Sequence, residues 1–295
     1  MANSIALAST YLPILDEVYK AESKSAILDT ANERIRWTGG QTVYVFKVST
    51  DGFGTYNRGS GFVSGSVTST WEALQLAVDR GISLIVDAMD DAETLNMAFA
   101  STLGEFIRVH EVPEVDAYRF AKYASTVGID AGTAADITVG TTDVPGLIDA
   151  AELSMGDNEV PREGRILFVS ETAYAGLKAK ITRYLANEGE VNREIEMYDG
   201  MRVIRVPADR FNTAITLNAG SGTYGYTVGG YPINFMIIHP SAVIQVIRHN
   251  PIKVFSPAEN QTADAWKLQI RCYHDCFVLA NKLKGVYLHK ASTAN

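Results

Sequence analysis

The chain has 295 residues, 46% of them hydrophobic and 20% charged, which is the composition of a globular protein and not of a disordered one. Its 26 Lys and Arg residues against 34 Asp and Glu residues make a net charge of −8, which argues against attachment to DNA or to an anionic membrane by bulk charge. No apolar run approaches the roughly 18 residues of a membrane-spanning helix, and the N-terminus lacks a secretory signal. The two cysteines, Cys272 and Cys276, exclude a disulfide framework and fit a reducing compartment.

The N-terminal quarter of the chain predicts an arm followed by a long β-ribbon. Residues 1–40 mix apolar, charged and small side chains without a sustained period, which is typical of an arm that lies on another surface. From Gln41 the period changes to two, and β-branched and aromatic residues predict two antiparallel strands that end near Leu76. The stretch between them, 49–61, contains four glycines and predicts a flexible tip. Because a two-stranded ribbon is marginal alone in water, we expect this one to lie on a partner.

The remainder predicts one long helix and an α/β lobe. Apolar residues at spacings of three and four predict a helix over about residues 91–126, with acids at its start and a restart at Pro113. Residues 134–250 alternate helix and strand patterns, and 266–289 read mostly as strand. The other expected elements are strands at 82–86, 165–170 and 233–238, helices at 143–155, 174–185 and 240–249, and a hairpin that turns at Asp199-Gly200.

A glycine-rich string in the lobe matches the dinucleotide-binding fingerprint by letter only. Gly220-Ser-Gly222-Thr-Tyr-Gly225 has the spacing G-x-G-x-x-G, whose mechanism needs a helix N-terminus directly after the glycines and an acid about twenty residues on. Here residues 226–232 cannot start a helix, and the next acid is Glu259. We therefore interpret the string as a flexible loop.

The remaining chemical motifs are weak. Cys272, His274 and Cys276 place three soft ligands on one face of a strand, but a structural zinc site wants four ligands, usually from two segments, so small buried core residues are the better interpretation. The acids at Asp87, Asp90, Asp91 and Glu93 lack the glycine turn of a calcium loop and favour charge at a helix start. We predict no catalytic residue, no metal ligand and no cofactor.

Six strings along nearly the whole chain resemble the tailed-phage major capsid proteins of the Hong Kong 97 type fold. Each is weak alone, and their order is distinctive. They are Ser4-Ile-Ala-Leu with Tyr11-Leu-Pro13; Gly61-Phe-Val-Ser-Gly-Ser-Val67; Asp79-Arg-Gly81 leading to Asp87-Ala-Met-Asp90; Pro113-Glu-Val-Asp-Ala-Tyr-Arg-Phe120; Pro161-Arg-Glu-Gly-Arg165; and Trp266 through Asp275.

The resemblance implies an α+β fold of five parts. These are an N-terminal arm (1–40), an extended β-hairpin loop (41–76), a peripheral domain with the spine helix (77–133), an axial α/β domain (134–250), and C-terminal strands that return to the peripheral domain (251–295). Those relatives that cross-link covalently pair an extended-loop lysine with a distant asparagine. The only lysine of this ribbon is Lys47, in the strand and not in the tip, so that chemistry is not carried over.

The resemblance also implies a structural role and its partners. Copies would form hexamers and pentamers and close an icosahedral shell, with a portal at one vertex, around double-stranded DNA bound without sequence specificity. The protein would be made and assembled in the cytoplasm of a bacterial host and would end in the virion. Some relatives carry an N-terminal scaffolding segment that this chain lacks, so either a separate scaffolding protein is used or maturation removes the segment; the initiating Met1 favours the separate scaffolding protein. With a net charge of −8, such a shell would hold its genome by confinement.

Two sets of residues are expected to serve assembly. The ribbon is expected to join one subunit to the next through Tyr44, Phe46, Asp51, Tyr56, Asn57, Arg58 and Trp71. The glycine-rich loop is expected near the axis of a capsomer through Gly220, Gly222, Gly225, Gly229 and Gly230. Two alternatives stay open: an encapsulin-type nanocompartment shell, which encloses cargo instead of a genome, and an α/β enzyme of unknown class.

Overall fold

The computed structural model describes residues 23–29, 35–37, 42–59, 61–89, 104–180, 194–220, 222–249 and 251–295. It divides into two compact units. The smaller is Ala31–Val78, and the larger combines Met1–Thr30 with Asp79–Asn295. Most of the expected arm over residues 1–40, and the first part of the expected helix over 91–126, lie outside the described residues.

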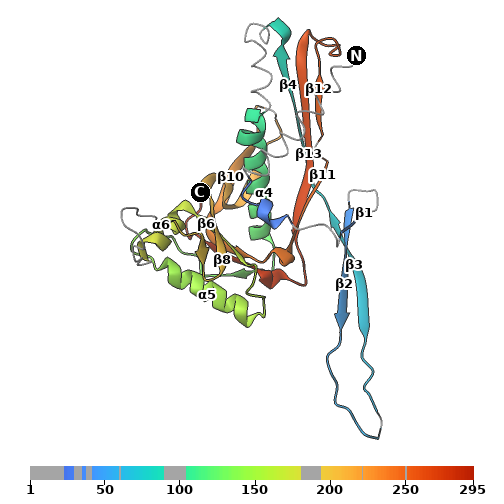
Figure 1. Ribbon diagram of the computed structural model, residues 1–295, viewed down its shortest axis with the longest axis vertical. Coiled ribbons are helices and arrows are strands. Elements are labelled where there is room, and N and C mark those ends of the chain that lie inside the picture. The colour runs from blue at the N-terminus through green and yellow to red at the C-terminus, as the bar shows by residue number, and fades with distance from the viewer. Residues whose placement is uncertain are drawn as a thin grey trace, which may run out of the picture. The chain divides into compact units, whose positions relative to one another are not determined.

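The smaller unit is a three-stranded antiparallel sheet. Its strands are β1 (Ile35–Trp37), β2 (Thr42–Thr50) and β3 (Val67–Gln75), in the order β1-β2-β3. β2 and β3 pair without a bulge over nine residues each, from Thr42 opposite Gln75 to Thr50 opposite Val67 (Figure 1). The two predicted strands of the ribbon are confirmed, because β-branched and aromatic residues favour the pleated conformation.

The larger unit contains a seven-stranded sheet. Its order is β5-β14-β10-β6-β8-β7, with β9 also paired to β10. The predicted hairpin at β7 and β8 is confirmed: Asp199 and Gly200 have φ angles of 44° and 79°, the left-handed pair that a tight two-residue turn requires. The strands are β5 (Asp130–Ala131), β6 (Ile166–Ser170), β7 (Met197–Tyr198), β8 (Met201–Val206), β9 (Asn212–Leu217), β10 (Tyr226–Ile238) and β14 (Val286–Lys290).

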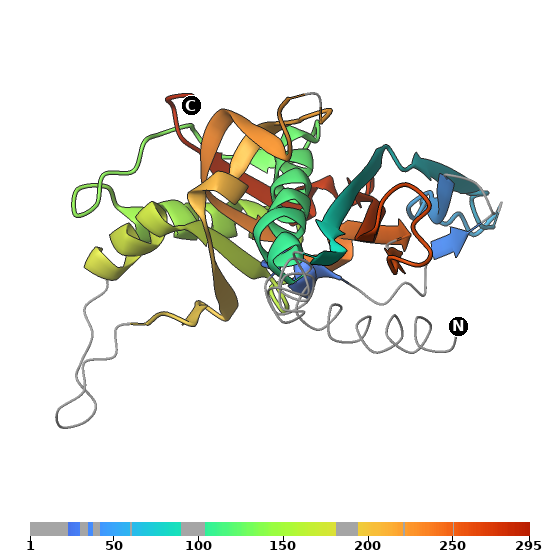
Figure 2. The same ribbon diagram turned by 90° about the horizontal axis from the view of Figure 1, so that it is seen from above.

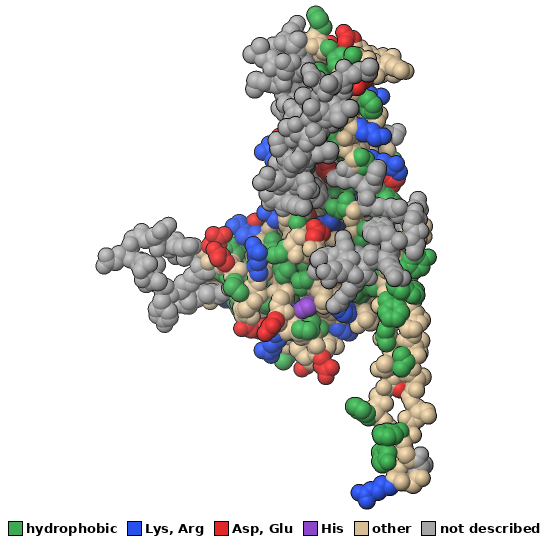
Figure 3. Space-filling model, turned by 45° about the vertical axis from the view of Figure 1, so that its right-hand side comes forward, with side chains coloured by type: hydrophobic (Ala, Val, Ile, Leu, Met, Phe, Trp, Pro, Cys, Tyr) green, Lys and Arg blue, Asp and Glu red, His purple; other side chains and the backbone are tan. Residues whose placement is uncertain are grey.

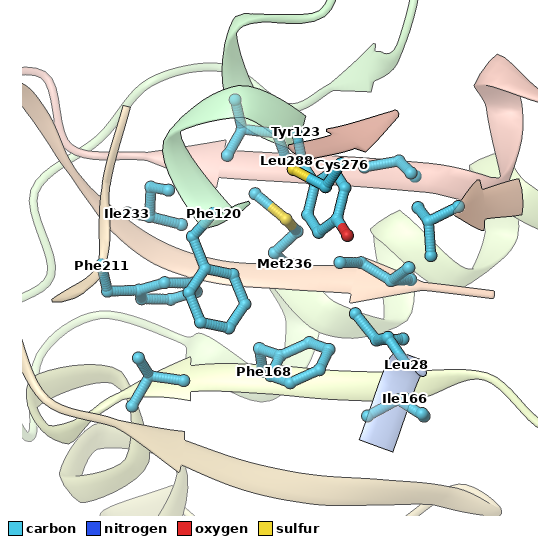
Figure 4. Close-up of a cluster of buried hydrophobic side chains, with 14 of the residues drawn as sticks. Leu28, Phe120, Tyr123, Ile166, Phe168, Phe211, Ile233, Met236, Cys276 and Leu288 are labelled. Carbon is cyan, nitrogen blue, oxygen red and sulfur yellow. The ribbon is translucent and has the colours of Figure 1, made fainter. Parts of the chain in front are cut away.

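Helices cover both faces of this sheet. α5 (Val144–Asp157) and α6 (Glu171–Lys180) pack on one face, where Leu167 and Val169 of β6 point. α4 (Val112–Ser125) packs on the other face, where Ile166 and Phe168 point, so β6 is a central strand that is buried on both faces. Figure 4 shows the core under α4, in which Phe120 contacts Phe168 and Phe211 edge-on at 5.1 Å between ring centroids.

A second sheet is built around β13 (Ala265–Val278). β11 (Val243–His249) and β12 (Ile252–Phe255) pair with successive parts of β13, and β4 (Val78–Asp87) also pairs with it. Apolar residues of the π-helical turn η2 (Ile107–Glu111) and of the first turn of α4 pack against Leu268 and Ile270 of β13. Seen from above, α4 lies between the two sheets (Figure 2).

The long helix agrees with prediction in its described part. Helical residues run from Gly104 through the π-helical turn η2 into α4, and Pro113 stands in the first turn of α4. Proline has no N–H group for the helical ladder, and the π-helical turn directly before it is the irregularity at which α4 begins. The predicted restart at Pro113 is therefore confirmed.

One expectation for the C-terminal third is wrong. The helix predicted over 240–249 is a single 3-10 turn, η4 (Pro240–Ala242), followed by β11, because the β-branched residues after it pair with β13. The assignment of residues 251–295 to the peripheral domain stays a prediction: β13 pairs with β4, and β14 pairs with β10 and β5 of the seven-stranded sheet.

A buried polar cluster attaches residues 23–29 to the middle of α4. The fully buried carboxylate of Asp116 accepts hydrogen bonds of 2.6–3.2 Å from backbone and hydroxyl groups of residues 23–25, and Arg210 lies 3.4 Å from it. One turn further on, the buried guanidinium of Arg119 donates to the Ser25 hydroxyl at 2.8 Å. A charge is tolerated in the interior only when it is paired and hydrogen-bonded in this way.

Removing that carboxylate is expected to destabilise the subunit strongly. Asp116→Ala would leave Arg210 and the buried donors of residues 23–25 without their main acceptor, at a cost of about 3–5 kcal/mol in the free energy of unfolding. Glu105→Ala is the matched control, because Glu105 pairs with Arg108 at the surface and its loss should change stability by about 0.5 kcal/mol or less. Urea unfolding of unassembled subunits measures both, and similar effects of the two changes would contradict the expectation.

Candidate assembly interface

One face of the ribbon carries an exposed apolar strip. Because side chains alternate along a strand and directly opposed residues share a face, Tyr44, Phe46 and Val48 of β2 lie on one face together with Trp71 of β3. The exposed fraction is 50% for Phe46, 55% for Val48 and 48% for Trp71, while Tyr44 is half-buried. Figure 3 shows hydrophobic side chains along the length of the ribbon.

The centre of this strip is a cross-strand aromatic pair. Phe46 stands directly opposite Trp71, and their ring centroids are 5.0 Å apart at an interplanar angle of 55°. Such a pair adds about 0.5–1.5 kcal/mol beyond burial, so it stiffens the ribbon without removing the rings from water. On the other face, Lys47 and Glu72 form an ion pair at 2.6 Å.

The tip of the ribbon is closed by its own hydrogen bonds, which differs from the flexible tip expected. The Asp51 carboxylate accepts from the backbone N–H and the hydroxyl of Ser66 at 2.7 and 2.6 Å, and these bonds lower the pKa of Asp51. Beyond them, Asn57 and Gly61 form a bridge, with Gly61 at a φ of 82°. Glycine accepts that angle without steric cost, so the tip forms a second small turn.

The end of the tip presents aromatic and basic groups to solvent. Tyr56 and Phe62 contact each other edge-on at 5.0 Å, with exposed fractions of 56% and 91%. Arg58 is exposed and, among the described residues, has no ion-pair partner. The residues expected at the interface are thus gathered on one ribbon. Two exposed apolar residues of the ribbon are not among those expected at the interface. They are Val48, which the period of two places on the same face as Phe46, and Phe62, an apolar residue in a polar stretch.

The glycine-rich string is the loop between β9 and β10, as its sequence context predicted, and no helix follows it. Gly220, Gly222, Gly225 and Gly230 have φ angles of 69–88°, a region where other residues are strained, and Gly229 pairs opposite Ala214 in the ladder. Of the five, Gly222 is exposed and the other four are half-buried. The position of this loop at a capsomer axis stays a prediction.

One arginine closes the base of that loop. The Arg80 guanidinium donates to the carbonyl oxygen atoms of Asn218 at 2.6 Å and Gly225 at 3.0 Å, on either side of the glycines. The same side chain forms a two-pronged pair with Glu114 of α4 at 2.6 and 3.1 Å. A planar fork can make all of these bonds at once, so β4, α4 and the loop are held by a single residue.

The cysteines and His274 lie in the core. Cys272, His274 and Cys276 have exposed fractions of 5%, 1% and 0%. Burial raises the pKa of both thiols, that of Cys276 to about 12, and burial with the charges of Arg119 and Arg80 lowers the pKa of His274 to about 3. Within the described ranges, no three side chains are grouped to hold a metal ion, and no helix has the length and apolarity to cross a membrane.

Comparison with known proteins gives structural matches only. No family model matches the sequence, and no curated protein does. The chain is similar to a chain of the cyanophage P-SCSP1u capsid, with 15% identity, a TM-score of 0.64, and coverage of 90% of this chain and 87% of that one. For a chain of Gordonia phage Cozz the identity is 13%, the TM-score 0.62, and the coverage 92% and 87%.

A third structural match is to a virus-like particle. The Pyrococcus furiosus particle has 12% identity, a TM-score of 0.56, and coverage of 98% of this chain and 100% of that one. This chain has the fold of the tailed-phage capsid proteins. The expected Hong Kong 97 type fold is therefore confirmed.

Burial of His274 predicts a loss of stability in acid. In the unfolded chain histidine binds a proton near pH 6.5, whereas in the fold His274 stays neutral down to about pH 3. The unfolded state therefore binds more protons as the pH falls through this window, and this group alone reduces stability by about 1.4 kcal/mol per pH unit.

Urea midpoints at about pH 7.5 and about pH 5 measure the effect. His274→Gln should show a smaller drop between the two pH values than the wild-type chain does. His110→Gln, which changes an exposed histidine of η2, should keep the wild-type drop. Equal drops in all three proteins would show that His274 does not carry the proton linkage.

Proposed function

We propose that this chain is the major capsid protein of a tailed phage, which assembles as hexamers and pentamers into the icosahedral head around double-stranded DNA. The observation that carries the proposal is a capsid fold whose ribbon forms a separate unit with an exposed apolar face. Its role is structural, without catalysis or a cofactor.

The parts of the chain take the corresponding roles. We assign residues 41–76 to the extended loop, 77–133 to the peripheral domain with α4 in its spine helix, and 134–250 to the axial domain, apart from β11. β13 returns to the peripheral domain and β14 to the axial sheet. This division is supported by the separation of residues 31–78 as a unit and by the two sheets on either side of α4.

The apolar strip supports a role for the ribbon as the main joint between subunits. Covering the exposed parts of Phe46, Trp71 and Val48 would stabilise a contact by on the order of 1 kcal/mol each. In water, the same strip invites aggregation. At the tip, the Arg58 fork is suited to a carboxylate of the neighbour. A contact between two different surfaces of identical chains generates a ring when the rotation between neighbours closes, and a closed ring is what a capsomer requires.

The partners follow from that role. They are further copies of the chain, a separate scaffolding protein, a portal at one vertex, and the enclosed DNA. The glycine-rich loop would lie near the capsomer axis. Assembly would take place in the host cytoplasm, and the protein would end in the virion.

An encapsulin-type nanocompartment is the second candidate. The observation that favours it is the match to the Pyrococcus furiosus virus-like particle over almost all of both chains. The neighbouring genes separate the two: portal and terminase genes support a phage head, and a ferritin-like or peroxidase cargo gene supports a nanocompartment.

Shortening the ribbon is expected to prevent assembly and leave the subunit folded. Thr50 and Val67 are the last paired residues, so replacing residues 51–66 by Asn-Gly closes the hairpin in register. The variant should match the wild-type chain in circular dichroism and unfolding midpoint but form few or no shells in sedimentation and electron microscopy. Leu153→Ser, on the exposed face of α5, is the control and should assemble normally. Normal shells from the shortened chain would show that the tip is not the joint.

Isolated subunits are expected to bind duplex DNA weakly. With a net charge of −8 the chain lacks the excess of cations that releases counterions from phosphates, so confinement in the shell would retain the genome. Electrophoretic mobility at low and moderate salt tests this. Tight binding that weakens steeply with added salt would contradict it.

A further inference from the structure

The larger unit contains a cavity of about 560 Å³ that is lined by four segments distant in sequence. The segments are residues 80–84, 106–115, 218–225 and 270–274. The lining is mostly apolar, and its aliphatic side chains belong to one hydrophobic cluster with β13; they are Ile82, Leu84, Val115 and Ile270. Small-molecule sites of proteins measure about 300–1,000 Å³ and have apolar walls with a few polar groups. The cavity has the size and the lining of such a site.

The charged groups of the lining are already paired. Arg80 forms its two-pronged pair with Glu114 at 2.6 and 3.1 Å and donates its other bonds to two backbone carbonyl groups of the glycine-rich loop. Glu111 interacts with the thiol of Cys272. His110 lines the cavity from an exposed position. A charged ligand would lose its hydration here and break existing pairs, so the cavity favours a neutral ligand.

One buried polar atom of the lining has no partner. His274 is 1% exposed, and its Nδ1 atom has no hydrogen bond within the described part of the chain. The ring is held edge-on against Tyr118 at 5.5 Å between centroids, and burial lowers the pKa of His274 to about 3, so the ring is neutral. In a neutral ring, Nδ1 donates or accepts according to the tautomer, and a hydroxyl group can do either. A ligand hydroxyl would therefore recover the free energy that an unpaired buried nitrogen costs.

Aromatic rings form a further part of the lining. Phe106 and His110 stand with their ring centroids 5.6 Å apart, and the ring of Tyr224, which is 71% exposed, lines the cavity from the glycine-rich loop. Rings attract one another in edge-on and offset-stacked arrangements beyond what burial alone provides. The apolar body of a ligand for this cavity is therefore expected to be aromatic.

We propose that this cavity binds a neutral aromatic alcohol, with its rings among Ile82, Leu84 and Ile270 and its hydroxyl group on Nδ1 of His274. The site lies within one subunit, so the inference does not rest on the proposed assembly. Because the four lining segments come together only in the folded chain, such a ligand binds the folded state and stabilises it against unfolding.

Two probes that differ by one hydroxyl group test the proposal. We expect 2-naphthol to raise the unfolding midpoint of the full chain and to bind about tenfold more tightly than naphthalene, because only 2-naphthol can hydrogen-bond to His274. Equilibrium dialysis measures both affinities. Absence of 2-naphthol binding up to its solubility limit would overturn the site, and equal affinities for the two probes would overturn the hydrogen bond to Nδ1.

Variants of two residues locate the bound probe. Ile82→Trp fills the lining and should weaken 2-naphthol binding by about tenfold or more. Ile85→Trp places the same side chain on the other face of β4, where Ile85 is 57% exposed, and should stay within about twofold of the wild type. His274→Phe keeps a ring but removes Nδ1, so it should bind the two probes equally.

The outcomes leave the proposed function separate. Unfolding midpoints without probe show that each variant is folded, and the comparison of the two probes on the wild-type chain needs no variant at all. Equal binding by the Ile82→Trp and Ile85→Trp chains would place the probe elsewhere and overturn the site. A preference for 2-naphthol that persists in His274→Phe would overturn the role of Nδ1. None of these measurements depends on whether shells form.

Discussion

Helix α4 packs in two hydrophobic cores at once, and the rest of the larger unit is arranged around it. Its first turn lies on β13 with Val112 and Val115 buried, and its second half buries Phe120 and Tyr123 against the seven-stranded sheet. A helix that is apolar on one side only could serve one sheet. This helix contacts two sheets because it buries different residues along its length, Val112 and Val115 near its start and Phe120 and Tyr123 near its end.

The polar residues between those two cores give the helix a fixed position. Asp116 and Arg119 are fully buried, and each is satisfied in part by residues 23–29 of a distant segment. Because an unpaired buried charge is costly, the helix cannot slide or rotate without losing several hydrogen bonds together. Arg80 adds a second constraint from the exposed side, since it holds Glu114 and the loop after β9 in one geometry. The surfaces offered by this unit are therefore set before any assembly begins.

The sequence predicts a structural feature best when the residues that determine it are close together in the chain. The ribbon, the Asp199-Gly200 hairpin and the restart at Pro113 follow from residue period and turn chemistry, and all three were predicted. The segment 240–249 was predicted wrongly, because Pro240 starts a helix as readily as it starts a single turn, and pairing with β13 decided the outcome. The closed tip depends on Asp51 and Ser66, fifteen residues apart, and the cavity on four remote segments. The period of apolar residues in a sequence does not predict contacts between such distant segments.

The ribbon differs from helix α4 because much of its apolar surface stays exposed to water. It has a straight, well-paired backbone and a closed tip, yet the rings of Phe46, Trp71 and Phe62 remain in contact with water. A strand pair whose shape is already formed loses little conformational entropy on binding, so covering these rings would cost little in ordering. If the ribbon of one copy met a different surface of a second copy, a row of copies would leave one free ribbon and one free receiving surface at its ends. Only closure into a ring would then satisfy all of them.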